Sequence, residues 1–470
     1  MRILFVNAVN KNDFSYNVPL SFAYLSGYLK NKMNTNGLYV KSISTPDIDR
    51  IERTIFNYKP NVVGISSTTP TFDKAIKISK LIKKICKDIV VVVGGQHISL
   101  LPESLSDAMD FGVLGEGEQT FLELLESINR KNKEYQDIAG LCFWSEGKLV
   151  NTKRRPHIKN LDNVSHPIRD LLNPTNNTLF SSRGCPYDCV FCSSSVMWDR
   201  KIRFHSAEYV FQEIYGLYKK GHSVQWFADD LFICNEERIK KIVDLIKENG
   251  LYKKIIFFAE SRSNLITNSI TSLIKELNIL RISFGFESAD DNVLKYAKGD
   301  SVTAEKHINA SEICRKYGIL VDGYFMTGFP LDNHETMRKT YEFAKNYCDT
   351  AGRLNLVMVF PRTYLKESLF NETGIDFSRV HLEKFKRNSY LPVEDETVFC
   401  NNLTKDEIID YIEKFNKLSK KKNMKFYTIF AKRLIFSKSF FMNIKFLMRN
   451  SLLRLNNPKR EFESEVIRLK

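Results

Sequence analysis

Short apolar segments alternate with helical segments along most of this 470-residue chain, and this alternation constrains the fold more than any other feature. Strands separated by helices favour a parallel sheet with helices on both faces. The first 145 residues therefore predict an α/β domain with a doubly wound, Rossmann-like sheet. Its expected strands are Ile3–Asn7, Val62–Ser66, Ile89–Val93 and Phe111–Leu114, and its expected helices are Leu20–Lys30, Phe72–Cys86 and Glu118–Ile128.

A second series of strands and helices occupies residues 177–370. Six strand–helix units fit an open, partial (β/α)6 barrel better than a closed eight-unit barrel, which usually needs ~250 residues. Residues 146–176 are polar and predict a linker that follows a hairpin around Glu146–Gly147, and residues 371–470 predict a largely helical region. The expected barrel strands are Thr178–Ser181, Val224–Ala228, Ile255–Ala259, Arg281–Gly285, Val321–Thr327 and Leu354–Phe360.

The positive charge is concentrated near the end of the chain. The net charge is +15, yet 14 Lys or Arg and no Asp or Glu lie between Lys414 and Arg460, so the remainder is nearly neutral. Helices that pack on the barrel and present a solvated basic face are the favoured interpretation. Docking on an anionic membrane surface and contact with an anionic substrate or nucleic acid are the alternatives. Apolar residues recur there at helical spacing: Phe426, Phe430, Leu434, Phe441, Ile444, Met448, Leu452 and Leu455.

Several features indicate a cytoplasmic protein. The N-terminal sequence MRILFVNAVN does not resemble a secretory signal, and we find no charge-free run of the ~18 apolar residues that a membrane span needs. Nine cysteines in a chain of this length are too few for a secreted disulfide scaffold. We therefore expect a cytoplasmic location, with peripheral membrane contact through the basic region left open.

Three cysteines carry the strongest chemical signal. Cys185, Cys189 and Cys192 are spaced C-x3-C-x2-C in the segment SSRGCPYDCVFC. Thiolates this close can hold one iron–sulfur cluster, and three ligands leave one iron of a four-iron cluster open. A structural zinc site and unrelated buried cysteines are the alternatives, but the nearest further zinc ligands, His205 and Cys234, lack the usual spacing.

The segments that follow this loop resemble the radical S-adenosylmethionine (SAM) superfamily, in the branch with an N-terminal cobalamin-binding-like domain. KIRFHSAEYVFQEI, FADDLF, AESRSN, GFESADDNVLKYAKG and GYFMTGFP are similar, in order, to motifs of that branch. The resemblance implies a [4Fe–4S] cluster on Cys185, Cys189 and Cys192, with SAM on its open iron. The SAM contacts that it implies are Phe191, Asp229 or Asp230, Arg262, Glu287, Ser288 and Gly328. A helix N-cap for either aspartate and a surface ion pair for Arg262 are the structural alternatives.

The first domain resembles the cobalamin-binding domain of the same branch through NVPLSFAYLSGYLK, VVVGGQHISLLPE and VLGEGEQTFLELLE. Ligands of parallel sheets bind beyond the carboxyl ends of the strands. The resemblance implies cobalamin contacts from Ser66, Thr68, Gly94, Gly95, Gly115, Glu116 and Gly117. The chain lacks a D-x-H-x-x-G loop, so no histidine from that motif binds cobalt, and tight turns without cobalamin remain the alternative. His97 is expected to have a loop role.

The resemblance implies a radical SAM enzyme that generates a 5′-deoxyadenosyl radical and methylates an unactivated carbon with cobalamin. A non-methylating rearrangement, cyclisation or C–C coupling is the second hypothesis, and a binding protein that retains a cluster without turnover is the third. The expected partners are a small-molecule, lipid or peptide substrate and a one-electron donor such as flavodoxin or ferredoxin; nucleic acid is not expected. The six other cysteines are widely separated, so we predict one cluster. No catalytic side chain is assigned.

Overall fold

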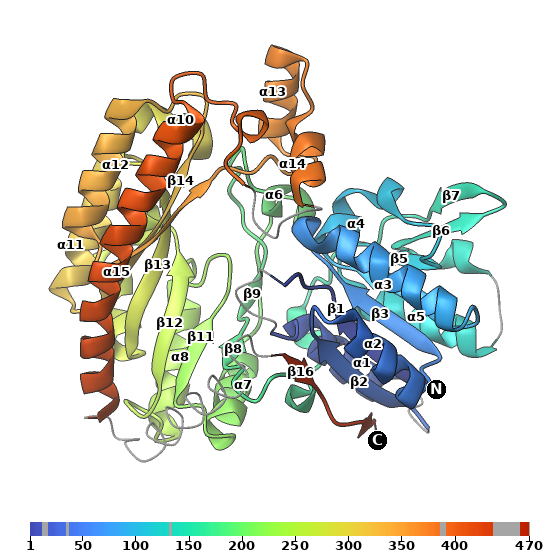
Figure 1. The fold of residues 1–470 in the computed structure, drawn as a ribbon. Helices are drawn as coiled ribbons and strands as arrows, with labels where there is room; N and C mark the ends of the chain where they lie inside the picture. The colour runs from blue at the N-terminus through green and yellow to red at the C-terminus, as the bar shows by residue number, and fades with distance from the viewer. Residues whose placement is uncertain (12–16, 34–36, 131–133, 386–391, 436–460, 470) are drawn as a thin grey trace. The chain divides into compact units, whose positions relative to one another are not determined.

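The structure is a computed structural model that describes residues 1–11, 17–33, 37–130, 134–385, 392–435 and 461–469 (Figure 1). The chain divides into two compact units. The N-terminal unit comprises Met1–Asn176, His381–Leu391 and Leu452–Lys470, and the barrel unit comprises Asn177–Val380 and Pro392–Ser451. Both expected α/β architectures are confirmed, and each is described separately below.

The N-terminal unit is built on a sheet whose five central strands are parallel, in the order β2-β1-β3-β4-β5. Buried apolar residues fill these strands, as in a sheet covered on both faces. The strands are β1 (Arg2–Asn7), β2 (Tyr39–Ser44), β3 (Val62–Ser66), β4 (Val90–Gly94) and β5 (Phe111–Val113). The expected strands are all present, whereas β2 was not predicted from the sequence.

Helices cover both faces of this sheet. The helices α1 (Leu20–Lys32) and α5 (Gly117–Arg130) lie on one face, where the ring of Phe5 stacks on Phe22 at 4.7 Å. The helices α2 (Ile48–Tyr58) and α3 (Phe72–Ile85) share a buried cluster on the other face with Leu4 and Val6. The short helix α4 (Gln96–Leu100) follows β4. Like β2, α2 was not predicted.

The segment expected to be a linker belongs to the N-terminal unit. The predicted hairpin exists as β6 (Leu141–Ser145) and β7 (Lys148–Asn151), but it extends the sheet antiparallel to β5. Residues 152–176 then pack against α1, since the N–H of Ile168 donates to the carbonyl of Ala23 at 3.0 Å. Polar composition alone did not reveal this packing, because backbone hydrogen bonds hold it.

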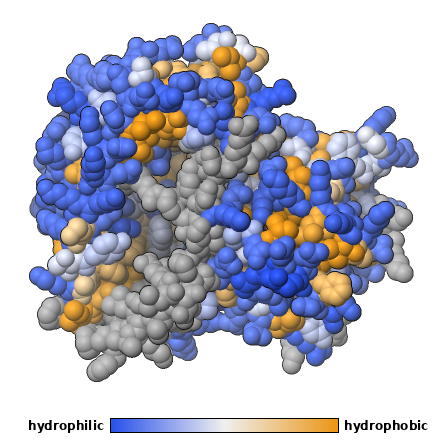
Figure 2. Space-filling model, in the orientation of Figure 1, coloured by the Kyte–Doolittle hydropathy of each residue, from blue (hydrophilic) through white to orange (hydrophobic). Residues whose placement is uncertain are grey.

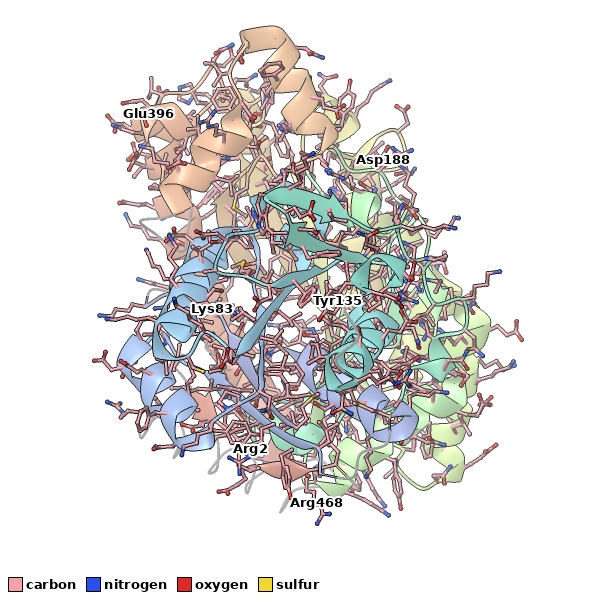
Figure 3. The ribbon with its side chains drawn as sticks, turned by 90° about the vertical axis from the view of Figure 1, so that its right-hand side faces the viewer. Arg2, Lys83, Tyr135, Asp188, Glu396 and Arg468 are labelled. Atoms are coloured by element: carbon pink, nitrogen blue, oxygen red, sulfur yellow. The ribbon has the colours of Figure 1, made fainter. Side chains whose placement is uncertain are left out.

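The last described residues also join the N-terminal sheet. The strands β16 (Phe462–Glu463) and β17 (Ile467–Arg468) pair antiparallel with β2. Arg468 lies opposite Tyr39, which lies opposite Arg2, so the two ends of the chain meet at one end of the sheet (Figure 3). The prediction of a helical region over 371–470 is therefore wrong for its final residues, because they complete the edge of a sheet that begins far away in sequence.

The barrel unit contains a curved parallel sheet of six strands in the order β15-β14-β13-β12-β11-β8. No pairing among the described residues joins β15 to β8, so the barrel is open, as predicted. The sixth strand begins and ends four residues before the predicted Leu354–Phe360, because Val357 and Val359 pack in an apolar cluster after the strand. The strands are β8 (Thr178–Leu179), β11 (Val224–Phe227), β12 (Ile256–Ser261), β13 (Ile279–Glu287), β14 (Leu320–Thr327) and β15 (Thr350–Leu356).

Helices form the outer layer of the barrel (Figure 1). Many begin at a side-chain cap; the carboxylate of Asp290, for example, accepts from the backbone of α10. These helices are α7 (Ala207–Lys219), α8 (Glu236–Glu248), α9 (Asn268–Glu276), α10 (Asp291–Lys298), α11 (Ala304–Lys316) and α12 (His334–Tyr347). Next come α13 (Tyr364–Thr373) and α14 (Phe377–Phe385).

The long helix α15 (Lys405–Ile435) packs along β15 and α12. Phe415, Phe426 and Leu434 of α15 are buried, so the favoured interpretation of the basic region holds for residues 414–435. The predicted periodic residues Phe441, Ile444, Met448, Leu452 and Leu455 lie outside the described residues. In the described part of the chain, no helix combines the length and apolar character that crossing a bilayer requires.

Candidate cofactor sites

The three predicted cluster ligands lie in one loop of the barrel unit, between β9 (Ser182–Arg183) and the short helix α6 (Ser194–Met197). Asp188, labelled in Figure 3, belongs to this cysteine loop, which we define as residues 184–193. Burial, together with the negative charges of Asp230, Cys189 and Cys192, raises the pKa of the Cys185 thiol to about 12. The pKa of Cys192 is raised by the same kinds of cause. The thiols are thus close together and half-buried.

This donor set fits an iron–sulfur cluster. Free thiols with raised pKa values become good ligands when a metal supplies the compensating positive charge. Within the described ranges, no three carboxylate, thiol or imidazole side chains converge on a single metal ion. Cysteines that hold a cluster bind different irons and need not converge on one point. The spacing therefore suits a cluster better than zinc.

A buried carboxylate anchors the start of the cysteine loop. Asp229, just beyond β11, is fully buried and accepts hydrogen bonds from both Ser181 and Ser182. The backbone N–H of Ser181 lies 2.7 Å from Oδ1, and the hydroxyl of Ser182 lies 2.6 Å from it. Arg238 of α8 donates to the carbonyl of Ser181 at 3.0 Å. The carboxylate of Asp229 therefore holds Ser181 and Ser182 in place. Of the two predicted aspartates, only Asp230 is accessible to a SAM ammonium group.

The other predicted aspartate has different surroundings. Solvent reaches Asp230, yet the surrounding protein removes part of its hydration and, together with the charge of Asp229, raises its pKa. It also interacts electrostatically with the Cys185 and Cys192 thiols. A carboxylate next to the cysteine loop is placed to accept from a cationic ligand group.

Glycine is required at the beginning of the loop. Gly184 has a φ of +97°, and a Cβ there would lie 2.2 Å from the carbonyl oxygen of Lys201. Any side chain would push the loop away from this neighbouring backbone.

Two backbone hydrogen bonds hold the middle of the loop. The N–H of Val190 donates to the carbonyl of Ala297 at 3.0 Å, and its carbonyl accepts from the N–H of Leu365 at 2.9 Å. The next residue, Phe191, packs with its ring centroid 5.9 Å from that of Phe329. The structure therefore brings Phe191 together with the turn that contains Gly328.

Arg262 follows β12 and contacts the cysteine loop directly. Its Nη1 donates to Sγ of Cys189 at 3.0 Å, and its guanidinium lies 3.8 Å from the ring centroid of Tyr187. Its Nη2 donates to the hydroxyl of Ser301 at 3.2 Å. A surface ion pair does not describe this residue, which is 6% exposed. The predicted SAM-carboxylate contact lies beside the cluster ligands.

The two predicted ribose contacts, Glu287 and Ser288, end β13. Glu287 has a φ of +62°, and its Oε1 lies 3.3 Å from Nζ of Lys298. The hydroxyl of Ser288 is buried and lies 3.2 Å from that of Thr340. Ser288 thus fixes the strand-to-helix turn, and Glu287 is part of an ion pair that the sequence did not reveal.

The predicted adenine-side residue Gly328 has a φ of +96° and lies in a turn bound by a buried aspartate. Oδ2 of Asp332 accepts from the N–H of Gly328 at 2.8 Å and from the N–H of Phe329 at 3.0 Å. Burial raises the pKa of Asp332 to about 7. Sequence reasoning missed this anchor; its signal is an aspartate that closely follows the Gly-Phe-Pro turn.

Several polar side chains interact with one another across the neighbouring barrel strands β12, β13 and β14. Oδ2 of Asp322 accepts from Ser283 at 3.1 Å, and Arg281 approaches the same atom at 3.8 Å. Glu260 interacts electrostatically with Asp230, Asp322 and Arg281. Its pKa is raised to about 7, mainly by burial and in smaller part by the negative charges of Asp230 and Asp322. These residues were not predicted from the sequence, because only strand register brings them together.

The predicted cobalamin residues gather at one edge of the N-terminal sheet. Ser66 lies opposite Gly94, and Gly94 lies opposite Val113, so β3, β4 and β5 end at the same level. Gly95 has a φ of +110°, and a Cβ there would lie 2.4 Å from the carbonyl oxygen of Ser67. Gly115 has a φ of +73° and open space around its Cβ position. Gly94, Gly95 and Gly115 therefore leave this edge of the sheet without side chains, and we call these three residues the glycine floor.

The other residues at this edge differ in whether their polar side chains already take part in hydrogen bonds within the protein. Thr68 is exposed, and Ser67 is 2% exposed with no hydrogen-bond partner for its hydroxyl among the described residues. Glu116 instead accepts from the N–H of Ile158 at 2.8 Å, so its carboxylate holds the neighbouring chain. Gly117 begins α5. The glycine floor and the unsatisfied serine hydroxyl fit a large ligand such as cobalamin.

His97 lies in the short helix α4 and is 2% exposed, so the expectation of a loop role is wrong. Its Nδ1 lies 3.2 Å from the hydroxyl of Thr69, and its ring centroid lies 4.1 Å from that of Phe72. Burial lowers its pKa to about 4.

Comparisons with known proteins identify the families of both domains. The family model of the radical SAM superfamily matches residues 179–344, and that of the B12 binding domain matches residues 8–125. An uncharacterized methyltransferase from Pyrococcus horikoshii is 33% identical over 74% of this chain and 78% of its own length. The chain belongs to the radical SAM superfamily, in the branch that carries a B12-binding domain. It is therefore a radical SAM enzyme, and the expected cofactors, SAM with its iron–sulfur cluster and cobalamin, are those of the two matching families.

One further relative and one solved structure are similar to this radical SAM enzyme. The anaerobic magnesium-protoporphyrin IX monomethyl ester cyclase of Rubrivivax gelatinosus is 28% identical over 82% of this chain and 72% of its own length. The radical SAM methyltransferase TsrM of Kitasatospora setae has the same fold, with a TM-score of 0.65 at 17% identity. The match covers 79% of this chain and 76% of TsrM.

Proposed function

We propose that this radical SAM enzyme is a cobalamin-dependent C-methyltransferase that acts on an unactivated carbon. The observation that supports this proposal most is the loop of three half-buried thiols, anchored to an open six-stranded barrel, in a chain that also carries a B12-binding domain. The methyltransferase relative at 33% identity favours methyl transfer as the outcome.

The side chains divide into ligands and positioning groups. Cys185, Cys189 and Cys192 would hold the cluster, which supplies the electron that cleaves SAM, while cobalamin supplies the methyl group. Arg262, which contacts Cys189, would orient the SAM carboxylate, and Asp230 would accept from the SAM ammonium. Phe191 and the Gly328 turn would enclose the adenine in an apolar environment.

The N-terminal unit would position cobalamin on its glycine floor. Gly94, Gly95 and Gly115 leave space at the sheet edge, and the Ser67 hydroxyl offers an unused hydrogen-bonding group. We propose a small molecule, lipid or peptide as substrate and a flavodoxin or ferredoxin as the electron donor.

Anaerobic reconstitution tests the proposal. The protein is loaded with iron, sulfide and cobalamin, and both cofactors are quantified. With SAM and a strong reductant we expect 5′-deoxyadenosine, and with substrate also S-adenosylhomocysteine and a product heavier by one methyl group. The triple variant Cys185→Ala, Cys189→Ala, Cys192→Ala is the control; it should lose iron and SAM cleavage but keep cobalamin. Failure of the wild type to bind cobalamin at saturation would contradict the methyl-transfer half.

A second candidate is radical cyclisation or rearrangement without methyl transfer. The cyclase of Rubrivivax gelatinosus, 28% identical to this chain, favours this alternative. Product mass separates the two outcomes, because a cyclase product gains no methyl group and no S-adenosylhomocysteine accumulates. Both would show SAM cleavage that depends on the cysteine loop.

A further inference from the structure

The outer face of the second half of α15 carries exposed apolar side chains among lysines. Met424, Tyr427 and Ile435 are 73%, 64% and 50% exposed. Single exposed apolar residues are ordinary, but these three recur on one side of one helix. The adjoining side packs on the barrel through Phe426, Phe430 and Leu434. The exposed apolar side chains therefore border the face of the helix that the barrel covers.

The lysines on this outer face have no acidic neighbours on the helix. Lys420, Lys421, Lys425 and Lys432 are all exposed, and no Asp or Glu occurs after Glu413 within α15. Apolar residues interspersed with lysine characterise helices that lie in the interface of an anionic bilayer. The apolar side chains enter the headgroup region while the ammonium groups contact phosphates.

Basic residues of the barrel lie near the C-terminal end of α15. Arg433 lies near Lys275 of α9 and Lys253, and burial together with these two charges lowers the pKa of Lys275. The neighbouring Glu276 already pairs with Lys247 at 2.8 Å. Like charges that gather without carboxylates create a positive potential that an anionic surface would neutralise. Apolar surface is also visible at the lower left of Figure 2, where α15 ends in Figure 1.

We propose that this face, defined by Lys421, Met424, Lys425, Tyr427, Lys432 and Ile435, docks the enzyme on an anionic lipid bilayer. The charge complementarity selects acidic lipid headgroups, and the exposed apolar side chains distinguish a bilayer from a purely polar polyanion such as RNA. The contact is peripheral, because these side chains reach only the headgroup region. It brings the barrel to a surface from which a lipid-soluble substrate can be taken. The docking itself does not depend on the reaction proposed above.

Vesicle flotation with the full-length, cofactor-loaded protein tests the proposal. We expect co-flotation with phosphatidylcholine vesicles that contain phosphatidylglycerol, much weaker co-flotation with phosphatidylcholine alone, and a decrease at high salt. The variant Lys421→Gln, Lys425→Gln, Lys432→Gln should lower the partition coefficient at least about tenfold. The variant Met424→Ser, Tyr427→Ser, Ile435→Ser should also lower it at least about tenfold.

A control variant separates local docking from net charge. Lys240→Gln, Lys241→Gln, Lys295→Gln removes the same number of exposed lysines from α8 and α10, so it should float like the wild type. All variants replace exposed side chains, and unchanged melting and iron content would show that they fold. Equal losses in the control, equal binding to neutral vesicles, or binding to RNA in place of vesicles would each overturn the proposal.

Discussion

Arg262 donates a hydrogen bond from Nη1 to Sγ of Cys189 over 3.0 Å. The same guanidinium lies over Tyr187, so one side chain contacts two residues of the cysteine loop. The loop therefore depends on the end of β12 as well as on its own sequence. A cationic donor beside a ligand sulfur stabilises negative charge there, and the reduced form of a cluster carries more of it.

Replacing Arg262 should separate cluster assembly from cluster function. We expect Arg262→Gln to retain most of its iron, because the three thiols remain, and to lose SAM cleavage by roughly 10- to 100-fold. Iron analysis and the rate of 5′-deoxyadenosine release measure the two quantities. Arg200→Gln is the control, since Arg200 is 63% exposed in its side chain and pairs with Asp188. Equal effects of the two substitutions would contradict the role of Arg262.

The adjacent aspartates should respond differently to the same substitution. Asp229→Asn places an amide donor among the Ser181 and Ser182 donors and leaves Arg238 buried without its counter-charge. We expect a loss of roughly 3–5 kcal/mol in unfolding free energy and reduced iron incorporation. Asp230→Asn should keep iron and stability but weaken SAM binding about tenfold or more. Melting, iron content and SAM titration distinguish the pair; the reverse pattern would exchange their roles.

The sequence allowed the architecture to be predicted because periodic apolar segments are local signals. The order of strands and helices and the cysteine spacing can be read without long-range contacts. The roles of Asp229 and Asp230 could not be separated in this way, since adjacent residues share the same motif. Only the structure shows that Ser181 and Ser182 surround the first carboxylate.

Features that depend on distant pairing were missed. The strands β16 and β17 have two residues each, and their pairing with β2 joins residues more than 400 positions apart. Glu260, Arg281 and Asp322 likewise meet only through the register of three strands. Asp332 binds the Gly328 turn from within the same loop, so its position could have been recognised as an aspartate that caps backbone N–H groups.

The buried carboxyl of Asp332 should make stability depend on pH. Burial raises its pKa from the ordinary value of 3.8 to about 7 in the folded protein, so the folded state binds a proton more tightly. The contribution of Asp332 to the free energy of unfolding is therefore greatest below pH ~4, and it decreases by on the order of 4 kcal/mol as the pH rises towards 7. The cause is the burial of the carboxylate charge, which two backbone N–H groups offset only in part.

Asp332→Asn tests this dependence directly. The amide oxygen can still accept from Gly328 and Phe329, and the amide nitrogen can face Thr336, but no charge forms. We expect the melting temperature of the variant, relative to the wild type, to rise between pH 5 and pH 8. A difference that stays constant over this range would show that Asp332 does not titrate there.

Gly115 offers a test of where cobalamin binds. Its φ of +73° is one that asparagine tolerates, and no atom lies within 4 Å of its Cβ position. Gly115→Asn should therefore fold normally but place a side chain over the glycine floor, and we expect the Kd for cobalamin to rise at least about tenfold. Gly147→Asn is a matched control, because Gly147 has a φ of +74° and equally open surroundings in the β6–β7 turn. Cobalamin binding is measured by titration with equilibrium dialysis. If Gly115→Asn and Gly147→Asn bind cobalamin alike, the ligand does not lie over this edge of the sheet.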